Sequence, residues 1–348
     1  MPLAPVRPYR QVPFHVISEQ CEARELRSTH QSKWGRFPAM RWLAAVFLAL
    51  LASGCGSDEP GARPMPDGSV ASCSGLADLA RTDRYLELSS DGVVRNYYVY
   101  VPASYQPTQA TPLVLSFHGL SSNASQQRLL DGLTALASDF GFIVVHPEGT
   151  GAAQSWNAGE CCGEAQMSGI DDVRFVDELL DQLSTELCID ASRIYSTGMS
   201  NGGFMSYRLA CELGDRIAAI APVAGGVAVQ PCLPGRPIPV LHFHGTADTL
   251  VPYLGLPAMG LPPVTELVES WAASNDCNRD PTTTYDTGDA TCISYEGCQA
   301  DATTTLCTIE TGGHTWPGSD LALPFGKTSE DIAATEEIWR FFSMHSLP

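Results

Sequence analysis

The sequence predicts an α/β fold, with a mostly parallel central sheet that carries helices on both faces. Strand-like apolar runs alternate with stretches of helical periodicity from residue 95 to residue 345, which is the pattern of such a sheet. The motif Gly198-Met199-Ser200-Asn201-Gly202 stands between a β-like run and a helical pattern, as it does at a strand–turn–helix corner. Hydrophobic residues make up 44% of the chain, which is ample for a large core.

The elements follow from short β-rich runs and from apolar residues at helical spacing. In chain order, the predicted strands are Arg95–Val101, Leu113–Phe117, Phe142–Val145, Ile194–Thr197, Ile217–Val223, Pro239–Phe243 and Leu306–Ile309. The predicted helices are Gln127–Asp139, Asp172–Leu187 opened by Asp171, Gly203–Leu213 and the amphipathic closing helix Glu330–His345. The stretch Asn275–Thr305 holds three cysteines and is expected to be a disulfide-stabilised segment of the same domain, not a separate domain.

The first 55 residues predict export. From Met40 a short basic start precedes an apolar run of ten residues, and small residues precede Cys55; this is the pattern of a signal peptide, too short for a membrane span. The ending Leu51-Ala52-Ser53-Gly54-Cys55 resembles the lipobox of bacterial lipoproteins, which implies a lipid anchor on Cys55. The alternative is ordinary secretion with cleavage near Cys55. Residues 1–39 show no period, so we expect Met40 to be the true start.

The resulting division is an N-terminal extension and signal peptide over 1–55, a flexible tether over 56–72 and one catalytic domain over 73–348. The tether is predicted from its Gly, Pro, Ser and Asp content. From residue 56 onward the chain has 13 basic and 36 acidic residues. Such a balance repels phosphate backbones and excludes a nucleic-acid partner, and membrane contact is expected only through the anchor.

Cysteine usage agrees with export. Besides Cys21 and Cys55 the chain has ten cysteines, and an even number in an exported protein predicts disulfides. A metal site is disfavoured because no C-x-x-C pair occurs and no histidine lies at ligand spacing. The spacing alone leaves the connectivity open.

Ser200 is the predicted nucleophile, and it needs a base and an acid that orients the base. In this type of corner the chain order is serine, acid, histidine, and each group follows a strand. His314, between glycines after the last predicted strand, is the predicted base, and Asp248, after Pro239–Phe243, is the predicted acid. The alternatives are a capping serine, a loop histidine with a structural hydrogen bond and a turn-forming aspartate.

The other histidines fit the base less well. His118 and His146 precede the serine, His242 lies within a strand, and His244 precedes the acid in the same loop. The oxyanion of an acyl-transfer intermediate needs two backbone donors. We expect the amides of Asn201 and Leu120 to supply them, the alternative for the 118–120 segment being a plain turn.

Six motifs together carry a resemblance to a known family. The motifs, in order, are Phe117-His118-Gly119, Ser155-Trp156-Asn157 with Cys161-Cys162, Asp171-Asp172-Val173, Gly198-Met199-Ser200-Asn201-Gly202-Gly203, His244-Gly245-Thr246-Ala247-Asp248 with Val251-Pro252-Tyr253, and Gly312-Gly313-His314-Thr315-Trp316-Pro317-Gly318. They resemble the poly(3-hydroxybutyrate) depolymerase and feruloyl esterase family of secreted α/β-hydrolases, including its bacterial lipoprotein members, over roughly residues 85–345.

The resemblance implies an α/β-hydrolase fold and a Ser200–Asp248–His314 triad. It also implies hydrolysis of carboxylic esters without metal or organic cofactor, on plant cell-wall esters or hydroxyalkanoate polyesters. It further implies the disulfides Cys211–Cys232 and Cys277–Cys298, which leaves Cys292–Cys307 as a third pair.

Two aromatic residues lie near the predicted site in sequence. Trp156 and Trp316 are candidates for stacking on a feruloyl or sugar ring, and the alternative is a structural role for each ring. The leading hypothesis is therefore a secreted, lipid-anchored serine esterase. A serine peptidase on the same scaffold and a surface binding lipoprotein without catalysis are the alternatives. The sequence leaves the natural ester open.

Overall fold

The computed structural model describes Cys73 and residues 76–348. The predicted signal peptide, the Cys55 anchor and the tether lie outside the described residues. Within the described part of the chain, no helix has the length and apolar character needed to cross a membrane.

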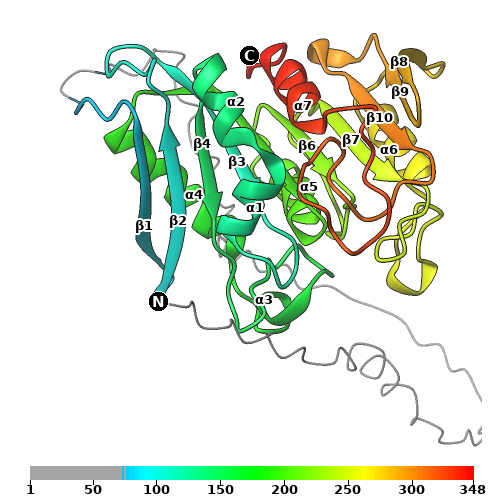
Figure 1. The fold of residues 1–348 in the computed structure, drawn as a ribbon, viewed down its shortest axis with the longest axis horizontal. Coiled ribbons are helices and arrows are strands. Elements are labelled where there is room, and N and C mark those ends of the chain that lie inside the picture. The colour runs from blue at the N-terminus through cyan, green and yellow to red at the C-terminus, as the bar shows by residue number, and fades with distance from the viewer. Residues whose placement is uncertain (1–72, 74–75) are drawn as a thin grey trace, which may run out of the picture. The chain divides into compact units, whose positions relative to one another are not determined.

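Ten strands of the described residues form one sheet in the order β1-β2-β4-β3-β5-β6-β7-β10-β9-β8 (Figure 1). The six central strands, from β4 to β10, are parallel, and antiparallel pairs flank them at both edges. The strands are β1 (Thr82–Ser90), β2 (Val93–Val101), β3 (Thr111–Phe117), β4 (Ile143–Pro147), β5 (Ile189–Met199), β6 (Ala219–Val223), β7 (Val240–Gly245), β8 (Thr282–Thr287), β9 (Ala290–Tyr295) and β10 (Thr304–Ile309). The predicted mostly parallel sheet is confirmed.

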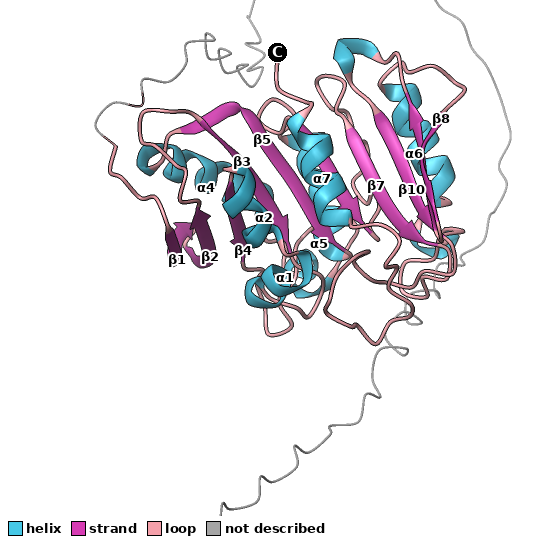
Figure 2. Cartoon of the chain, turned by 45° about the horizontal axis from the view of Figure 1, so that its top comes forward, coloured by secondary structure: helices cyan, strands magenta, loops and turns pink. Residues whose placement is uncertain are grey.

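Helices cover both faces of the sheet. One layer consists of α1 (Ala124–Asp131), α2 (Leu133–Phe140) and α7 (Ala334–Ser343), which lie in front of the sheet in Figure 2. The other layer consists of α4 (Asp172–Glu186), α5 (Asn201–Glu212) and α6 (Val264–Ser274), while the short α3 (Gly163–Met167) lies in the connection after β4.

Strand β3 shows how the sequence builds two cores. All seven of its residues are buried. Leu113, Leu115 and Phe117 pack into the core beneath α4 and α5, and Val114 packs into the core beneath α7. Alternate side chains point to opposite faces of a strand, so a strand covered on both faces is a continuous apolar run. The run Leu113–Phe117 was predictable for that reason.

The structure divides one predicted helix and shows how the predicted disulfide-stabilised segment joins the domain. The predicted helix Gln127–Asp139 is divided into α1 and α2 at Gly132, whose φ of 61° ends the first helix because a left-handed residue terminates helical hydrogen bonding. The segment 275–305 contributes β8 and β9 to the main sheet, which agrees with its assignment to the same domain.

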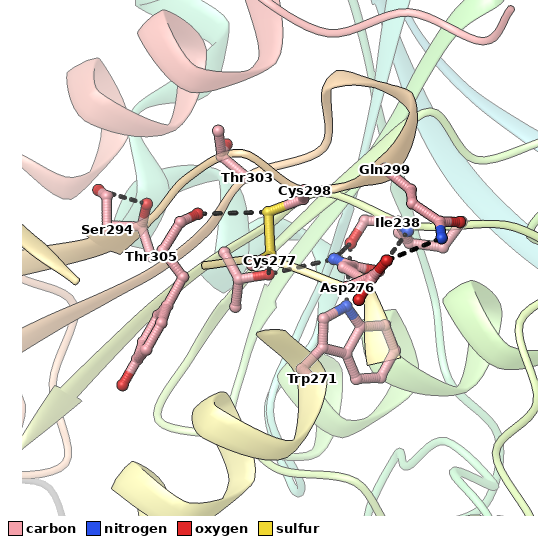
Figure 3. Close-up of a disulfide and its surroundings, with 12 residues drawn as sticks. Ile238, Trp271, Asp276, Cys277, Ser294, Cys298, Gln299, Thr303 and Thr305 are labelled. Atoms are coloured by element: carbon pink, nitrogen blue, oxygen red, sulfur yellow. Dashed lines mark hydrogen bonds between the residues drawn. A yellow bond between two sulfur atoms is a disulfide. The ribbon is translucent and has the colours of Figure 1, made fainter. Parts of the chain in front are cut away.

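Five disulfides occur among the described cysteines. Two are the pairs that the resemblance implies, Cys211–Cys232 and Cys277–Cys298, and a third is the additional expected pair, Cys292–Cys307. The other two are Cys73–Cys188 and Cys161–Cys162, which the sequence left unassigned. Figure 3 shows Cys277–Cys298 joining the end of α6 to the segment between β9 and β10. In this region the Trp271 indole N–H donates to the Ile238 carbonyl over 2.9 Å, which fixes α6 beside β7.

Candidate active site

The predicted site residues follow four parallel strands that end at one edge of the sheet. The last pairs in register are Phe117 with Gly198, Met199 with Val223, Val223 with Phe243 and Gly245 with Ile309. The loops that begin at residues 118, 200, 246 and 310 therefore leave the sheet together. This is the edge at which parallel α/β sheets place their ligands.

Ser200 occupies a sharp corner between β5 and α5. Its backbone has φ of 57° and ψ of −122°, a conformation that costs free energy for a residue with a side chain. A Cβ on Gly198 would lie 2.5 Å from the Phe117 carbonyl oxygen, and a Cβ on Gly202 would overlap the same carbonyl. The two glycines thus let the corner approach β3, which leaves Ser200 partly exposed at the edge.

His314 and Asp248 form a direct, buried pair. Nδ1 of His314 donates to Oδ2 of Asp248 over 2.6 Å, and the two residues are 3% and 5% exposed. The other carboxylate oxygen, Oδ1, accepts from the Leu250 and Val251 amides, each over 2.8 Å. Burial acts to raise the pKa of Asp248, but hydrogen bonds from His244 and His314 outweigh it, so the pKa lies well below its usual value. Asp248 is therefore ionised, and Nε2 of His314 is left free to accept a proton.

The serine lies at the same edge of the sheet as this pair, since β5, β7 and β10 all end there, but it is not bonded to the pair. Within the described residues the Ser200 hydroxyl makes no hydrogen bond, to His314 or to any other group. Its amide donates to the Val223 carbonyl over 2.9 Å. Catalytic hydrogen bonds often tighten only when substrate is bound, so Ser200 stays the candidate nucleophile without this bond.

The loop with the predicted oxyanion donor Leu120 packs against the serine. A Cβ on Gly119 would lie 3.4 Å from Cβ of Ser200. In the described part of the chain, the amides of Leu120 and Asn201 have no hydrogen-bond acceptor among loops, turns and side chains, and Asn201 begins a helix, where amides lack intrahelical partners. Both donors are thus available.

His118 holds that loop in place. Its Nε2 accepts from the Gly149 amide over 2.9 Å, its Nδ1 donates to the Gly119 carbonyl over 2.8 Å, and its own carbonyl accepts from the Trp156 indole over 3.0 Å. Burial lowers the pKa of His118 to about 4, so the ring is neutral at pH 7. A histidine that the sequence offered only as a poor candidate base therefore has a structural role.

The Asn201 side chain joins the serine corner to the loop after β4. Its Oδ1 accepts from the Trp156 amide over 2.7 Å, and its Nδ2 donates to the Trp156 carbonyl over 3.0 Å. The next amide, of Asn157, donates to Asp172 over 2.7 Å, and Asp172 forms a fully buried ion pair with Arg95 at 2.6 Å. Trp156 is thus fixed through its backbone on both sides.

The prediction that Trp156 and Trp316 offer rings to substrate is wrong, and the structural alternative holds for both. Both side chains are fully buried. Trp156 lies edge-on against Phe117, and the Trp316 indole donates to the Thr335 hydroxyl over 3.0 Å. An exposed aromatic residue beside His314 is Phe325, which is 43% exposed and has its ring centroid 6.3 Å from that of His314. It lies in a loop without any motif, so no sequence pattern pointed to it.

Among the described residues, no group of three or more His, Cys, Asp or Glu side chains is arranged to hold a metal ion.

A family model described as Esterase PHB depolymerase matches residues 95–231. The family and the arrangement of the sheet agree with the α/β-hydrolase fold that the resemblance implies.

This chain is similar to curated esterases and to solved structures, among them the following three. Feruloyl esterase B of Piromyces equi is 34% identical over 234 residues, which cover 63% of this chain and 42% of that protein. The putative esterase NocK of Nocardia uniformis subsp. tsuyamanensis is 31% identical over 265 residues, which cover 70% of this chain and 76% of that protein. The chain therefore spans less than half of the Piromyces protein. The acetyl xylan esterase from Aspergillus awamori shares the fold, with a TM-score of 0.53 and 14% identity over 75% of this chain and 99% of that chain.

Proposed function

Because the chain belongs to the Esterase PHB depolymerase family, we propose that it is a carboxylic ester hydrolase with a Ser200–His314–Asp248 triad. The observation that carries this proposal is the buried 2.6 Å contact between His314 and Asp248, at the same edge of the sheet as the positive-φ Ser200. An ionised aspartate at Nδ1 holds the imidazole in the tautomer whose Nε2 accepts a proton.

The reaction follows from these positions. Oγ of Ser200 attacks the ester carbonyl carbon while Nε2 of His314 takes the hydroxyl proton. The amides of Leu120 and Asn201 stabilise the oxyanion. The C–O bond to the alcohol then breaks, and His314 gives its proton to the leaving alkoxide. Water repeats the sequence on the acyl-enzyme, which releases the acid and restores the serine.

The substrate class that we propose is a feruloyl or acetyl ester of plant cell-wall polysaccharide, or a hydroxyalkanoate ester. The names of the similar proteins support the first two, since one is a feruloyl esterase and another an acetyl xylan esterase. The family description supports the third. All three share an ester carbonyl and differ in the acyl group that the edge of the site must accept.

We also propose that the protein is secreted and anchored by a lipid on Cys55, with the division into 1–55, 56–72 and 73–348. The five disulfides support an oxidising compartment. The lipobox-like ending at Cys55 supports the anchor.

The experiment compares purified wild type with Ser200→Ala on p-nitrophenyl acetate, with labelling by a fluorophosphonate that reacts with activated serines. We expect Ser200→Ala to lose both turnover and labelling, and Ser184→Ala, a serine on α4 bonded to the Leu180 carbonyl, to keep both. Turnover in Ser200→Ala equal to wild type rejects the nucleophile. Wild type that cleaves a matched amide as fast as the ester is a peptidase, and wild type that neither turns over nor labels is a binding protein.

A further inference from the structure

Two histidines that the triad does not use lie behind its acid. His242 and His244 on β7 are 0% and 1% exposed, and their rings are stacked. Nε2 of His242 lies 2.9 Å from Nδ1 of His244, and Nδ1 of His242 lies 2.9 Å from the hydroxyl of Tyr207 on α5. We call Tyr207, His242 and His244 the histidine relay.

The far end of the histidine relay contacts the loop of the acid. Nε2 of His244 lies 2.8 Å from the Val251 carbonyl oxygen and 3.5 Å from Oδ2 of Asp248. Oδ2 is the oxygen that also accepts from His314. Two imidazoles, one at 2.6 Å and one at 3.5 Å, therefore approach the same carboxylate oxygen of Asp248.

The hydrogen positions in the histidine relay follow from one acceptor. A carbonyl oxygen only accepts, so Nε2 of His244 carries a proton, and in the neutral ring Nδ1 then accepts. Nε2 of His242 must donate to that Nδ1, and Nδ1 of His242 accepts from the Tyr207 hydroxyl. Burial, with a smaller contribution from His244, holds the pKa of His242 well below its usual value, so the ring stays neutral.

We propose that His244 is a positioning residue for the acid, because its Nε2–H donates to the Val251 carbonyl beside Oδ2 of Asp248 and so holds the turn of the acid in place. The inference rests on the proposed triad. Oδ1 of Asp248 accepts from the Leu250 and Val251 amides and Oδ2 accepts from His314, so His244 supplies the constraint on the turn that carries these amides. The Tyr207–His242 pair selects the His244 tautomer that can donate.

His244→Leu removes the donor and replaces the imidazole with an apolar side chain of similar size. We expect kcat on p-nitrophenyl acetate to fall about 10- to 100-fold with little change in KM, as for other residues that orient a functional group. His244→Gln, which places an amide N–H near the position of Nε2, should recover most of kcat.

The pH profile separates positioning from packing. Without the His244 donor, the Asp248 carboxylate interacts more strongly with His314 and favours the protonated imidazole. The acid limb of the plot of kcat/KM against pH should therefore move to higher pH in His244→Leu. The titratable groups that face His244 are His242 on β7, Tyr253 in the following loop and Asp248, and beyond them Tyr207 and His314. Of these, only Asp248 joins the relay to the base.

His146→Leu is the matched control. His146 on β4 is 1% exposed, and its Nε2 lies 2.9 Å from a carboxylate oxygen of Asp131, a buried pair outside the proposed site. Its loss should lower the unfolding temperature and leave the acid limb unmoved.

The proposal is overturned if folded His244→Leu keeps kcat within about threefold of His146→Leu, or if its acid limb does not move to higher pH. If His244→Leu does not fold, ¹⁵N NMR of the wild-type imidazoles decides: both His242 and His244 must carry the proton on Nε2, and an Nδ1–H tautomer at either ring overturns the proposal. If the wild-type protein is inactive, the proposed function is rejected instead. The imidazole tautomers seen by NMR then show separately whether the proposed role of His244 also fails.

Discussion

His314 donates to Asp248 over 2.6 Å although 66 positions separate the two residues in the chain. The contact exists because β7 and β10 are parallel neighbours whose last pair in register is Gly245 with Ile309. Each residue lies a few positions beyond the end of its strand, so the sheet brings the two loops together. In this arrangement the base and the acid of the proposed triad depend on one strand pair.

Asp248→Asn should lower kcat about 10⁴-fold, because an amide can hold His314 in the wrong tautomer while the geometry stays intact. The variant should fold, since Asn keeps the acceptor for the Leu250 and Val251 amides. Steady-state kinetics on p-nitrophenyl acetate measures the effect. Asp215→Asn, at an aspartate that lies outside the proposed site, is the control and should match wild type. If kcat of Asp248→Asn stays within tenfold of wild type, the assignment of Asp248 as the acid of the triad is wrong.

Gly202→Ala should destabilise the fold by about 3 kcal/mol or more, because its Cβ would overlap the Phe117 carbonyl and overpacking against backbone has no flexible group to yield. Thermal unfolding measures the change. Gly235→Ala is the matched control, because no atom lies within 4 Å of a Cβ at that position, and it should unfold like wild type. Equal unfolding temperatures for the two variants would argue against a close contact between the serine corner and β3.

The central sheet was predictable from the sequence because its strands are buried on both faces. Such strands are continuous apolar runs, as in β3 and β4. The edge strands were missed for the opposite reason. β1 alternates exposed and partly buried residues along almost its whole length, and β8 is almost wholly exposed, so neither has the apolar run that marks a central strand. Pairing with a neighbour across the sheet forms these strands.

The site was predictable only as far as chain order and strand ends determine it. Ser200, Asp248 and His314 each follow a strand, and the parallel sheet places strand ends at one edge. The ring directions of Trp156 and Trp316 depend on distant partners, the His118 carbonyl and the Thr335 hydroxyl. The contact of His242 with Tyr207, which lies 35 positions away, likewise leaves no local pattern.

Stability should fall as the pH is lowered from about 6.5 to about 4, because burial lowers the pKa of His118 to about 4. In this range the unfolded chain binds a proton at His118 and the folded protein does not, so lowering the pH favours unfolding. The loss from this residue is at most on the order of 3 kcal/mol. Denaturant unfolding at several pH values measures it.

His118→Asn tests the source of that slope, since Asn does not titrate. The slope of unfolding free energy between pH 6.5 and 4 should become smaller. It should not vanish, because burial also lowers the pKa of His345 to about 4. A slope identical to that of wild type would mean that His118 titrates alike in the folded and unfolded states.

Cys55→Ser should move the protein from the membrane fraction to the soluble fraction, because a lipid thioether cannot form on serine. Detergent phase partitioning and metabolic labelling with palmitate measure the change. Cys21→Ser is the control, since residue 21 precedes the predicted start at Met40, and it should leave the anchor unchanged. Continued membrane association of Cys55→Ser favours ordinary secretion or another means of attachment.

Phe325→Ala should lower kcat/KM for methyl ferulate about 3- to 10-fold, because an aromatic acyl group bound at Ser200 can pack on the exposed ring beside His314, a contact worth about 0.5–1.5 kcal/mol. The acetyl group of p-nitrophenyl acetate is too small to pack on that ring, so kcat/KM for this substrate should change less than about twofold. Phe140→Ala, which removes a ring that is 60% exposed on α2, controls for loss of surface aromatics. Kinetics on methyl ferulate, acetylated xylan and hydroxybutyrate oligomers then ranks the acyl groups. Equal losses on all esters would mean that Phe325 acts by packing against His314 and not by contacting the acyl group. No loss on any ester would mean that the acyl group binds on another side of the serine.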